Sequence, residues 1–361
     1  MVEDDSHEYE DLVEEYISST KLKLLFIIIL LVICAGCSLY SMTVYGGGMT
    51  VQHMLDMLIG HINNVEYEFH SKDWFDSIIV WNSALPRLIF TIIAGIGLAV
   101  AGASMQSSMN NPLADPYTVG VSAGACLGLA VALTLGFSIN TGGLTGIIVF
   151  AFLFSLFPLL AIILLAPKTK SSPATLILAG VALSYLFNSA NTIIMVVSDA
   201  ETLESIYSWQ VGTLAGIRWD NLPLAAVAVG TGSVIILALS RKLNLLSMGD
   251  ASATSLGIDP DNLRIICLIA IAFIVGAIVG SAGVIGFVGL VTPHIVRTLL
   301  GSDNRYVLPA AAVLSVTILV ISDTICRCLS DYSDIPVGTV VSLIGAPIFL
   351  YLIVRRNSRV W

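Results

Sequence analysis

One segment of the chain matches a catalytic motif. Gly120-Val-Ser122-Ala-Gly124 fits the GxSxG pattern of serine hydrolases, and His294 is the candidate base. A hydrolase holds this serine between a strand and a helix, whereas apolar residues typical of a membrane helix surround Ser122. An intramembrane serine protease is therefore a remote alternative, and we expect no catalytic residues in this chain.

Histidines and cysteines could ligate a metal ion. Three histidines share one polar segment with four acids: His53, His61, His70, Asp56, Glu66, Glu68 and Asp73. Their spacings of eight and nine residues do not place the imidazoles on one helical face. The cysteines, including the pair Cys34 and Cys37, lie in apolar segments, where a thiol packs as a small hydrophobic group. We interpret the polar segment as solvated and expect no metal site.

The sequence contains no phosphate-binding loop of the GxxxxGK[ST] type. We therefore expect no cofactor in this chain. If its activity uses ATP and Mg²⁺, a partner subunit must bind them.

Composition places these motifs in a membrane. The 361 residues are 56% hydrophobic and 11% charged, whereas soluble domains average about 25% charged. About 20 apolar residues span a bilayer, and a helix satisfies its own backbone hydrogen bonds there. The sequence predicts an all-α polytopic protein with ten spans: 22–45, 82–105, 115–135, 144–166, 173–198, 222–240, 264–280, 286–300, 307–328 and 336–354.

Basic residues predict the orientation, because they concentrate in the cytoplasm. With the N-terminus inside, the outside keeps only Lys72, Arg87, Arg218 and Arg327. The inside collects Lys21, Lys23, Lys168, Lys170, Arg241, Lys242, Arg264, Arg297, Arg305, Arg355, Arg356 and Arg359. We expect both termini in the cytoplasm, an acidic, mobile tail at 1–21, a permease domain at 22–361 and an external loop at 46–80.

Two glycine-rich stretches resemble each other. Gly95 and Gly102 are seven residues apart, as are Gly276 and Gly283, and an Ala precedes the second glycine in both. The predicted topology makes these stretches antiparallel, as in transporters built from inverted halves. Small residues also let any two membrane helices approach closely, so the repeat is a hypothesis.

The cytoplasmic connection 241–264 contains helix start and stop signals. Ser247 with Asp250 resembles a capping box, Gly257 suits a left-handed stop, and Pro260 prevents continuation. We predict a short, rigid docking helix instead of a flexible tether.

Charged residues at membrane depth are costly and are commonly functional. Arg87 begins the second span, Asp115 lies in an NPLADP turn predicted on the cytoplasmic side, and Asp323 and Arg327 lie near the outer end of the ninth span. Asp323 and Arg327 are spaced at i and i+4, so they could simply neutralise each other. A functional role is an equally good interpretation of this spacing.

Several long motifs resemble those of permeases of the iron-chelate and vitamin B12 family of ABC importers. They are LPR (85–87), AGASMQSSMNNPLADPYTVGVSAGA (101–125), LILAGVALS (176–184), WQVGTL (209–214), LNLLSMGDASATSLGI (243–258), SAGVIGFVGLVTPHIVR (281–297), ISDTICR (321–327) and IPVGTVVSLIGAPIFLYL (335–352). The motifs run in order from about residue 80 to the C-terminus.

The resemblance implies a type II importer permease in the cell membrane of a prokaryote. It implies ten helices per subunit with inverted-repeat halves, a homodimer around a central pathway, two ATPase subunits below and a substrate-binding protein outside. Membrane lipid is expected to surround the protein, and no nucleic-acid partner is expected. The implied activity is ATP-driven import of a bulky ferric siderophore, haem or cobalamin by alternating access. An ion-coupled secondary transporter is the alternative, and the lack of acids buried mid-span argues against it.

The resemblance also assigns roles to residues. Coupling to the ATPase is implied for 243–262, with Ser247, Gly249, Asp250, Ala253, Leu256 and Gly257 as motif positions. Binding-protein docking is implied for Arg87 and Arg327, although Ala84 replaces a common family arginine. Packing or gating is implied for Gly95, Gly102, Asn111, Pro112, Asp115, Pro116, Gly120, Gly283, Gly286 and Pro293.

Overall fold

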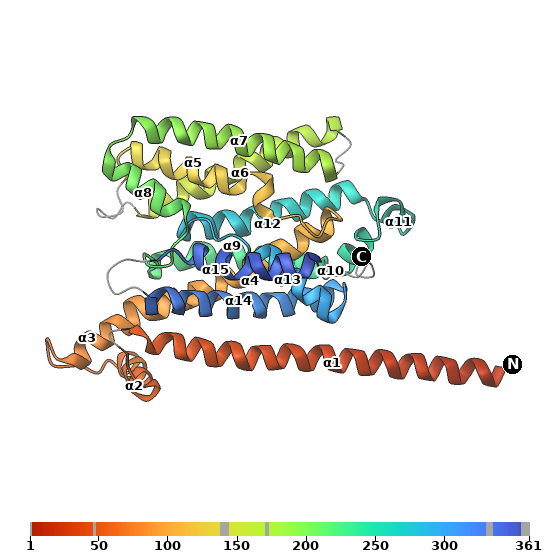
Figure 1. The fold of residues 1–361 in the computed structure, drawn as a ribbon, viewed down its shortest axis with the longest axis horizontal. Coiled ribbons are helices and arrows are strands. Elements are labelled where there is room, and N and C mark those ends of the chain that lie inside the picture. The colour runs from red at the N-terminus through yellow and green to blue at the C-terminus, as the bar shows by residue number, and fades with distance from the viewer. Residues whose placement is uncertain (1, 46–47, 138–143, 170–172, 330–334, 355–361) are drawn as a thin grey trace.

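The computed structural model describes residues 2–45, 48–137, 144–169, 173–329 and 335–354, which form helices and turns without a strand (Figure 1). The α-helices are α1 (Val2–Thr43), α2 (Val51–Ile62), α3 (Lys72–Ile79), α4 (Leu85–Ser108), α5 (Val121–Thr134), α6 (Leu144–Thr169), α7 (Pro173–Val197), α8 (Ala200–Gln210), α9 (Leu222–Ala238), α10 (Ser240–Leu246), α11 (Asp250–Ser255), α12 (Pro260–Ala282), α13 (Val288–Leu300), α14 (Asn304–Leu329) and α15 (Val337–Val354). The long helices lie side by side in one bundle (Figure 1).

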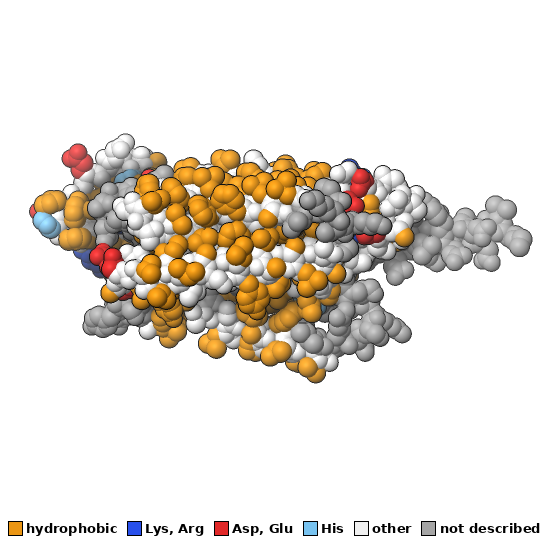
Figure 2. Space-filling model, turned by 90° about the horizontal axis from the view of Figure 1, so that it is seen from above, with side chains coloured by type: hydrophobic (Ala, Val, Ile, Leu, Met, Phe, Trp, Pro, Cys, Tyr) orange, Lys and Arg blue, Asp and Glu red, His pale blue; other side chains and the backbone are white. Residues whose placement is uncertain are grey.

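The surface of the bundle suits a bilayer. Figure 2 shows hydrophobic side chains over the middle of one face and acidic side chains near its two ends. Seven helical segments among the described residues are long and apolar enough to cross a membrane, and three shorter apolar helices accompany them. Each predicted span overlaps one of these ten segments. The polytopic all-α class is confirmed, whereas the count of ten crossings stays a prediction.

The N-terminal region is helical. Helix α1 begins at Val2 and continues without a break to Thr43. The assignment of residues 1–21 as an acidic, mobile cytoplasmic tail stays a prediction.

The predicted loop 46–80 contains two short helices. The hydroxyl of Thr50 accepts a hydrogen bond from the backbone nitrogen of His53 and caps α2. Ser71 caps α3 by accepting from the nitrogen of Trp74. A π-helix, Val80–Ala84, then joins α3 to α4. Capping hydroxyls placed three residues before their donors are the local cause of these helices.

Helix α4 lies at the centre of the bundle, and nearly all its residues from Phe90 onward are buried. Its glycines let other backbones approach closely. A Cβ at Gly102 would lie 1.8 Å from the carbonyl oxygen of Gly289 in α13, and one at Gly95 would lie 2.8 Å from Cα of Val316 in α14. Only glycine permits these two contacts.

The packing has the symmetry expected of inverted halves. Gly95 of α4, in the second predicted span, contacts α14 in the ninth. Gly276 of α12, in the seventh span, contacts α6 in the fourth, where its Cβ would lie 2.1 Å from Oγ of Ser155. Spans two and seven are five apart in the chain, and so are spans four and nine. The two contacts therefore occupy equivalent positions in the two halves of five spans. Helix α12 runs antiparallel to α4, since Arg264 near its start contacts Ser108 at the end of α4.

We predict that Gly102→Ala lowers the thermal stability of the purified protein, because its methyl group overlaps the Gly289 carbonyl oxygen. Overpacking of this kind costs about 1–3 kcal/mol. Gly230→Ala in α9 is the matched control, because no atom lies within 4 Å of its Cβ position. Thermal melts in detergent compare the two variants, and equal melting temperatures would contradict the packing described above.

Candidate functional site

A short helix, α11, projects at one end of the bundle beyond the start of α12 (Figure 1). It stops as predicted: Gly257 has φ +80°, its nitrogen donates to the Thr254 oxygen at 3.0 Å, and the Ile258 nitrogen donates to the Ala253 oxygen at 3.0 Å. These two bonds satisfy carbonyls at the helix end. The predicted capping box is wrong. The hydroxyl of Ser247 donates back to the Leu243 oxygen at 2.8 Å, because Ser247 ends the preceding helix α10.

Asp250 instead binds a buried arginine. Arg264 of α12 is fully buried, and its Nη1 donates to Oδ2 of Asp250 at 3.1 Å while Nη2 donates to Oδ1. Its Nε donates to the carbonyl oxygen of Ser108 at 2.9 Å. A two-pronged arginine–carboxylate pair fixes geometry as well as charge. The pair therefore ties α11 to the start of α12 and to the end of α4.

A second buried arginine joins α13 to α4 at the same end. Nη2 of Arg297 donates to Oγ of Ser107 at 2.7 Å and to Oδ1 of Asn304 at 2.9 Å. Asn304 also donates its backbone nitrogen to Oδ1 of Asn244 in α10 at 2.8 Å. From the sequence, Arg264 and Arg297 are predicted only as cytoplasmic charges, and no local pattern indicates their partners Ser107, Asn244 and Asn304.

Asp303 fixes the turn between α13 and α14. It accepts from Nδ2 of Asn244 at 2.7 Å and from Nη2 of Arg305 at 2.6 Å. Burial alone would raise the pKa of Asp303, but the hydrogen bonds from Arg305 and Asn244 hold it below the usual value. The carboxylate therefore stays charged at neutral pH.

The predicted coupling residues divide into inward and outward side chains. Ala253 is fully buried and seats α11 on the bundle. Leu256 is 59% exposed, and Met248, just before α11, is 67% exposed. Two exposed apolar side chains on a rigid projection are suited to contact with a partner.

Arg87 and Arg327 lie together at the opposite end of the bundle. Nε and Nη2 of Arg87 donate to Oδ1 of Asp323 at 2.9 and 2.6 Å. Nε of Arg327 donates to Oδ2 of the same carboxylate at 3.1 Å, and Nη1 donates to the Ser41 oxygen of α1 at 2.7 Å. Arg87 and Asp323 are only 8% and 3% exposed. In this conformation both arginines bind the carboxylate of Asp323 within the same chain. Their role in docking a binding protein stays a prediction.

Two broken segments meet inside the bundle. Oδ1 of Asp115 accepts from the backbone nitrogen of Tyr117 at 2.8 Å and caps the 3₁₀ helix Pro116–Val119. The hydroxyl of Tyr117 donates to the oxygen of Ile285 at 3.0 Å, between α12 and α13. Because α13 has 13 residues, its start lies about 20 Å from the α11 end. The NPLADP turn therefore begins at the α11 end, and the chain that follows it leads into the interior.

Backbone conformation supports packing roles for several predicted residues. Gly120 (φ +87°) begins α5, and Gly283 (φ +73°) ends α12 with its Cβ position 1.9 Å from the Trp209 oxygen. Oδ1 of Asn111 accepts from the Leu113 nitrogen at 3.0 Å. Gly286 differs, because no atom lies within 4 Å of its Cβ position. Two of the prolines, Pro116 and Pro293, are buried, whereas Pro112 is half-buried.

The structure places Ser122 where a hydrolase serine would not lie. A 3₁₀ helix precedes it in place of a strand, and Ser122 belongs to the first turn of α5. A Cβ at Gly124 would lie 2.5 Å from the Phe154 oxygen of α6. The small residues of GxSxG therefore let α5 pack closely on α6.

Asp323→Asn should strongly destabilise the protein, because it leaves the buried Arg87 and the largely buried Arg327 without their carboxylate. Breaking a buried ion pair on one side costs about 3–5 kcal/mol. Asp261→Asn is the matched control: its side chain is 51% exposed and lies 3.7 Å from Arg264, so its effect should be below about 0.5 kcal/mol. Thermal melts compare the two variants. An Asp323→Asn protein as stable as the unmodified protein would show that the ion pairs of Asp323 are dispensable for stability.

Comparison with known proteins agrees with this architecture. The chain is similar to an ABC transporter permease protein of Methanocaldococcus jannaschii, with 34% identity over 97% of this chain and 100% of the relative. It is also similar to the cobalamin import system permease protein BtuC of Halobacterium salinarum (38% identity, 78% of this chain, 75% of the relative). The hemin transport system permease protein HmuU of Yersinia pestis is 36% identical over 78% of this chain and 84% of its own.

A solved structure has the same fold. It is described as a metal-chelate type ABC transporter in an inward-facing conformation, and its TM-score is 0.80 with 29% identity over 91% of this chain and 99% of its own. The FecCD transport family matches residues 24–355. The chain therefore belongs to the FecCD transport family.

Proposed function

We propose that this chain is the membrane permease subunit of an ATP-driven importer of a bulky metal chelate. The observation that carries the proposal is α11, a short helix held by Asp250 and Arg264 at one end of the bundle. Because Arg264 also binds the end of α4, a force on α11 reaches the central helix through hydrogen bonds. An ATPase subunit that binds and moves α11 would therefore also move α4.

The two ends of the bundle have different roles in this proposal. The α11 end faces the cytoplasm and an ATPase subunit, which supplies ATP hydrolysis with Mg²⁺, and this chain is not itself an enzyme. The Arg87 end faces outward to a substrate-binding protein. The positions of Lys23, which lies 5.1 Å from the ring centre of Tyr306 in α14, and of Arg327 beside Ser41 support a topology in which these basic residues lie at opposite ends.

A second copy of the chain would complete the pathway. Helix α7 exposes three polar side chains in its C-terminal half, Asn188, Ser189 and Thr192. Polar groups at membrane depth normally face a protein partner or a water-filled cavity. We therefore place α7 toward the partner copy and the pathway of a homodimer.

The proposed cargo is based on the substrates that the names of the relatives give. Permeases of cobalamin and hemin importers are both more than one third identical to this chain. Ferric siderophore, haem and cobalamin are the three cargo classes that we propose. All are bulky metal complexes, and selection among them would reside in the binding protein.

Replacing Met248 and Leu256 together by Ser should reduce co-purification of the ATPase subunit at least tenfold, because both exposed apolar contacts are lost. Leu55→Ser, at a 41% exposed position of α2, is the matched control and should retain the ATPase. The measurement is the ratio of the two subunits after co-expression and affinity purification. Full retention by the double variant would contradict the assignment of the α11 end.

A further inference from the structure

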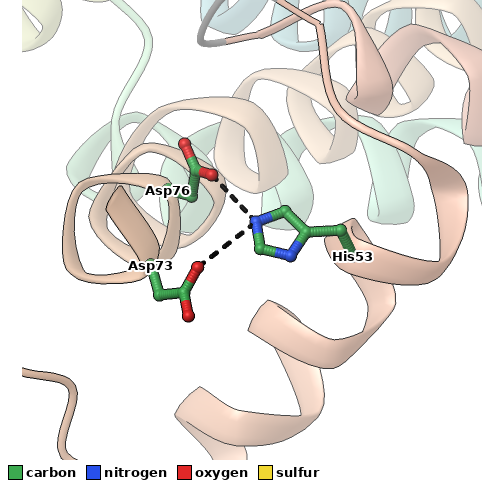
Figure 3. A group of neighbouring side chains, drawn as sticks. All are labelled: His53, Asp73 and Asp76. Carbon is green, nitrogen blue, oxygen red and sulfur yellow. Dashed lines mark hydrogen bonds and ion pairs between the residues drawn. The ribbon is translucent and has the colours of Figure 1, made fainter. Parts of the chain in front are cut away.

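A histidine of α2 faces two carboxylates of α3 at the Arg87 end of the bundle (Figure 3). Nε2 of His53 lies 2.8 Å from Oδ2 of Asp76 and 3.9 Å from Oδ1 of Asp73. Both contacts end on the same ring nitrogen (Figure 3). The three side chains therefore converge on one point from two helices.

Local helix geometry produces this convergence. The Thr50 cap places His53 in the first turn of α2. The Ser71 cap places Asp73 in the first turn of α3, and Asp76 follows three residues later. Residues at i and i+3 share one helical face, so both carboxylates point toward α2.

The donor atoms are spaced for a metal ion. One donor atom from each residue can be chosen so that all three lie within 4.8 Å of one another. Nitrogen and oxygen ligands bind Zn²⁺ at about 2.0–2.2 Å, which separates the donors of a tetrahedral site by about 3.3 Å. The distances of 2.8 and 3.9 Å bracket this value. In this structure a hydrogen bond joins Nε2 of His53 and Oδ2 of Asp76.

The charges of the cluster favour a cation. Asp76 is only 4% exposed, and neither carboxylate forms an ion pair with lysine or arginine in the part of the chain that the structure describes. Histidine supplies at most one positive charge to two acids. A divalent ion would balance both carboxylates and the desolvation of Asp76.

We propose that His53, Asp73 and Asp76 bind one divalent transition-metal ion that ties α2 to α3. An imidazole with two carboxylates suits zinc and neighbouring first-row ions better than Mg²⁺, which prefers oxygen ligands alone. Three protein ligands leave a position for water. The sequence alone predicts no metal site here, because the histidine spacings do not share a helical face and Asp76 lies 23 residues from His53.

Zinc binding to the full-length protein tests this site. The protein is purified through a tag without histidine, treated with a chelator and titrated with ZnCl₂ by calorimetry in detergent. We expect one tight site per chain, at least tenfold weaker binding in His53→Ala and in Asp73→Asn, and no comparable binding of Mg²⁺. Zinc should also raise the melting temperature of the unmodified protein but not of these variants.

His70→Ala and Asp56→Asn are the matched controls, since they remove the same side-chain types from the same segment. Both should bind zinc like the unmodified protein. Melts without zinc establish that all variants are folded, and the half-exposed positions of His53 and Asp73 favour this. Undiminished binding in His53→Ala, equal loss in His70→Ala, or equal binding of Mg²⁺ would each overturn the proposal.

Discussion

The need to pair buried guanidinium groups determines how this bundle is held together. Arg87 lies on α4 and binds Asp323 of α14, whereas Arg264 and Arg297 reach α4 from α12 and α13. A buried charge without partners is very costly, so each arginine fixes the helices that supply its hydrogen bonds. All three act on α4. The central helix is therefore fastened by directional contacts at both ends and by close glycine packing along its length.

This arrangement gives the two ends of the molecule different properties. At the α11 end, Arg264 connects a projecting helix to α4 through Asp250 and Ser108. At the opposite end, Asp323 holds α4, α14 and, through Arg327, α1. Between them, Tyr117 and Ile285 join two segments where helices are interrupted. Such interruptions are typical of transporter interiors, where backbone groups line the pathway.

The sequence predicts the apolar helices well, because length and composition are local properties. It also predicts the stop at Gly257, whose left-handed conformation depends on neighbouring residues only. It does not predict that Asp250 binds Arg264, because the spacing of Ser247 and Asp250 matches a capping box equally well. Nor does it predict the helices α2 and α3 in a segment rich in polar residues. The contacts of Ser107 with Asn304 and of His53 with Asp76 join distant parts of the chain, and no single window of sequence contains them.

In the proposed mechanism, an ATPase acting on the α11 end drives import of a metal chelate. Proteoliposomes that contain this permease, its ATPase and its binding protein, with ATP enclosed on the ATPase side, test it most directly. Uptake of cobalamin, haemin and a ferric siderophore is measured in parallel. We expect ATP-dependent accumulation of one of these three compounds, and no accumulation when ATP or the ATPase is omitted. Accumulation driven by an ion gradient without the ATPase would contradict the proposed mechanism.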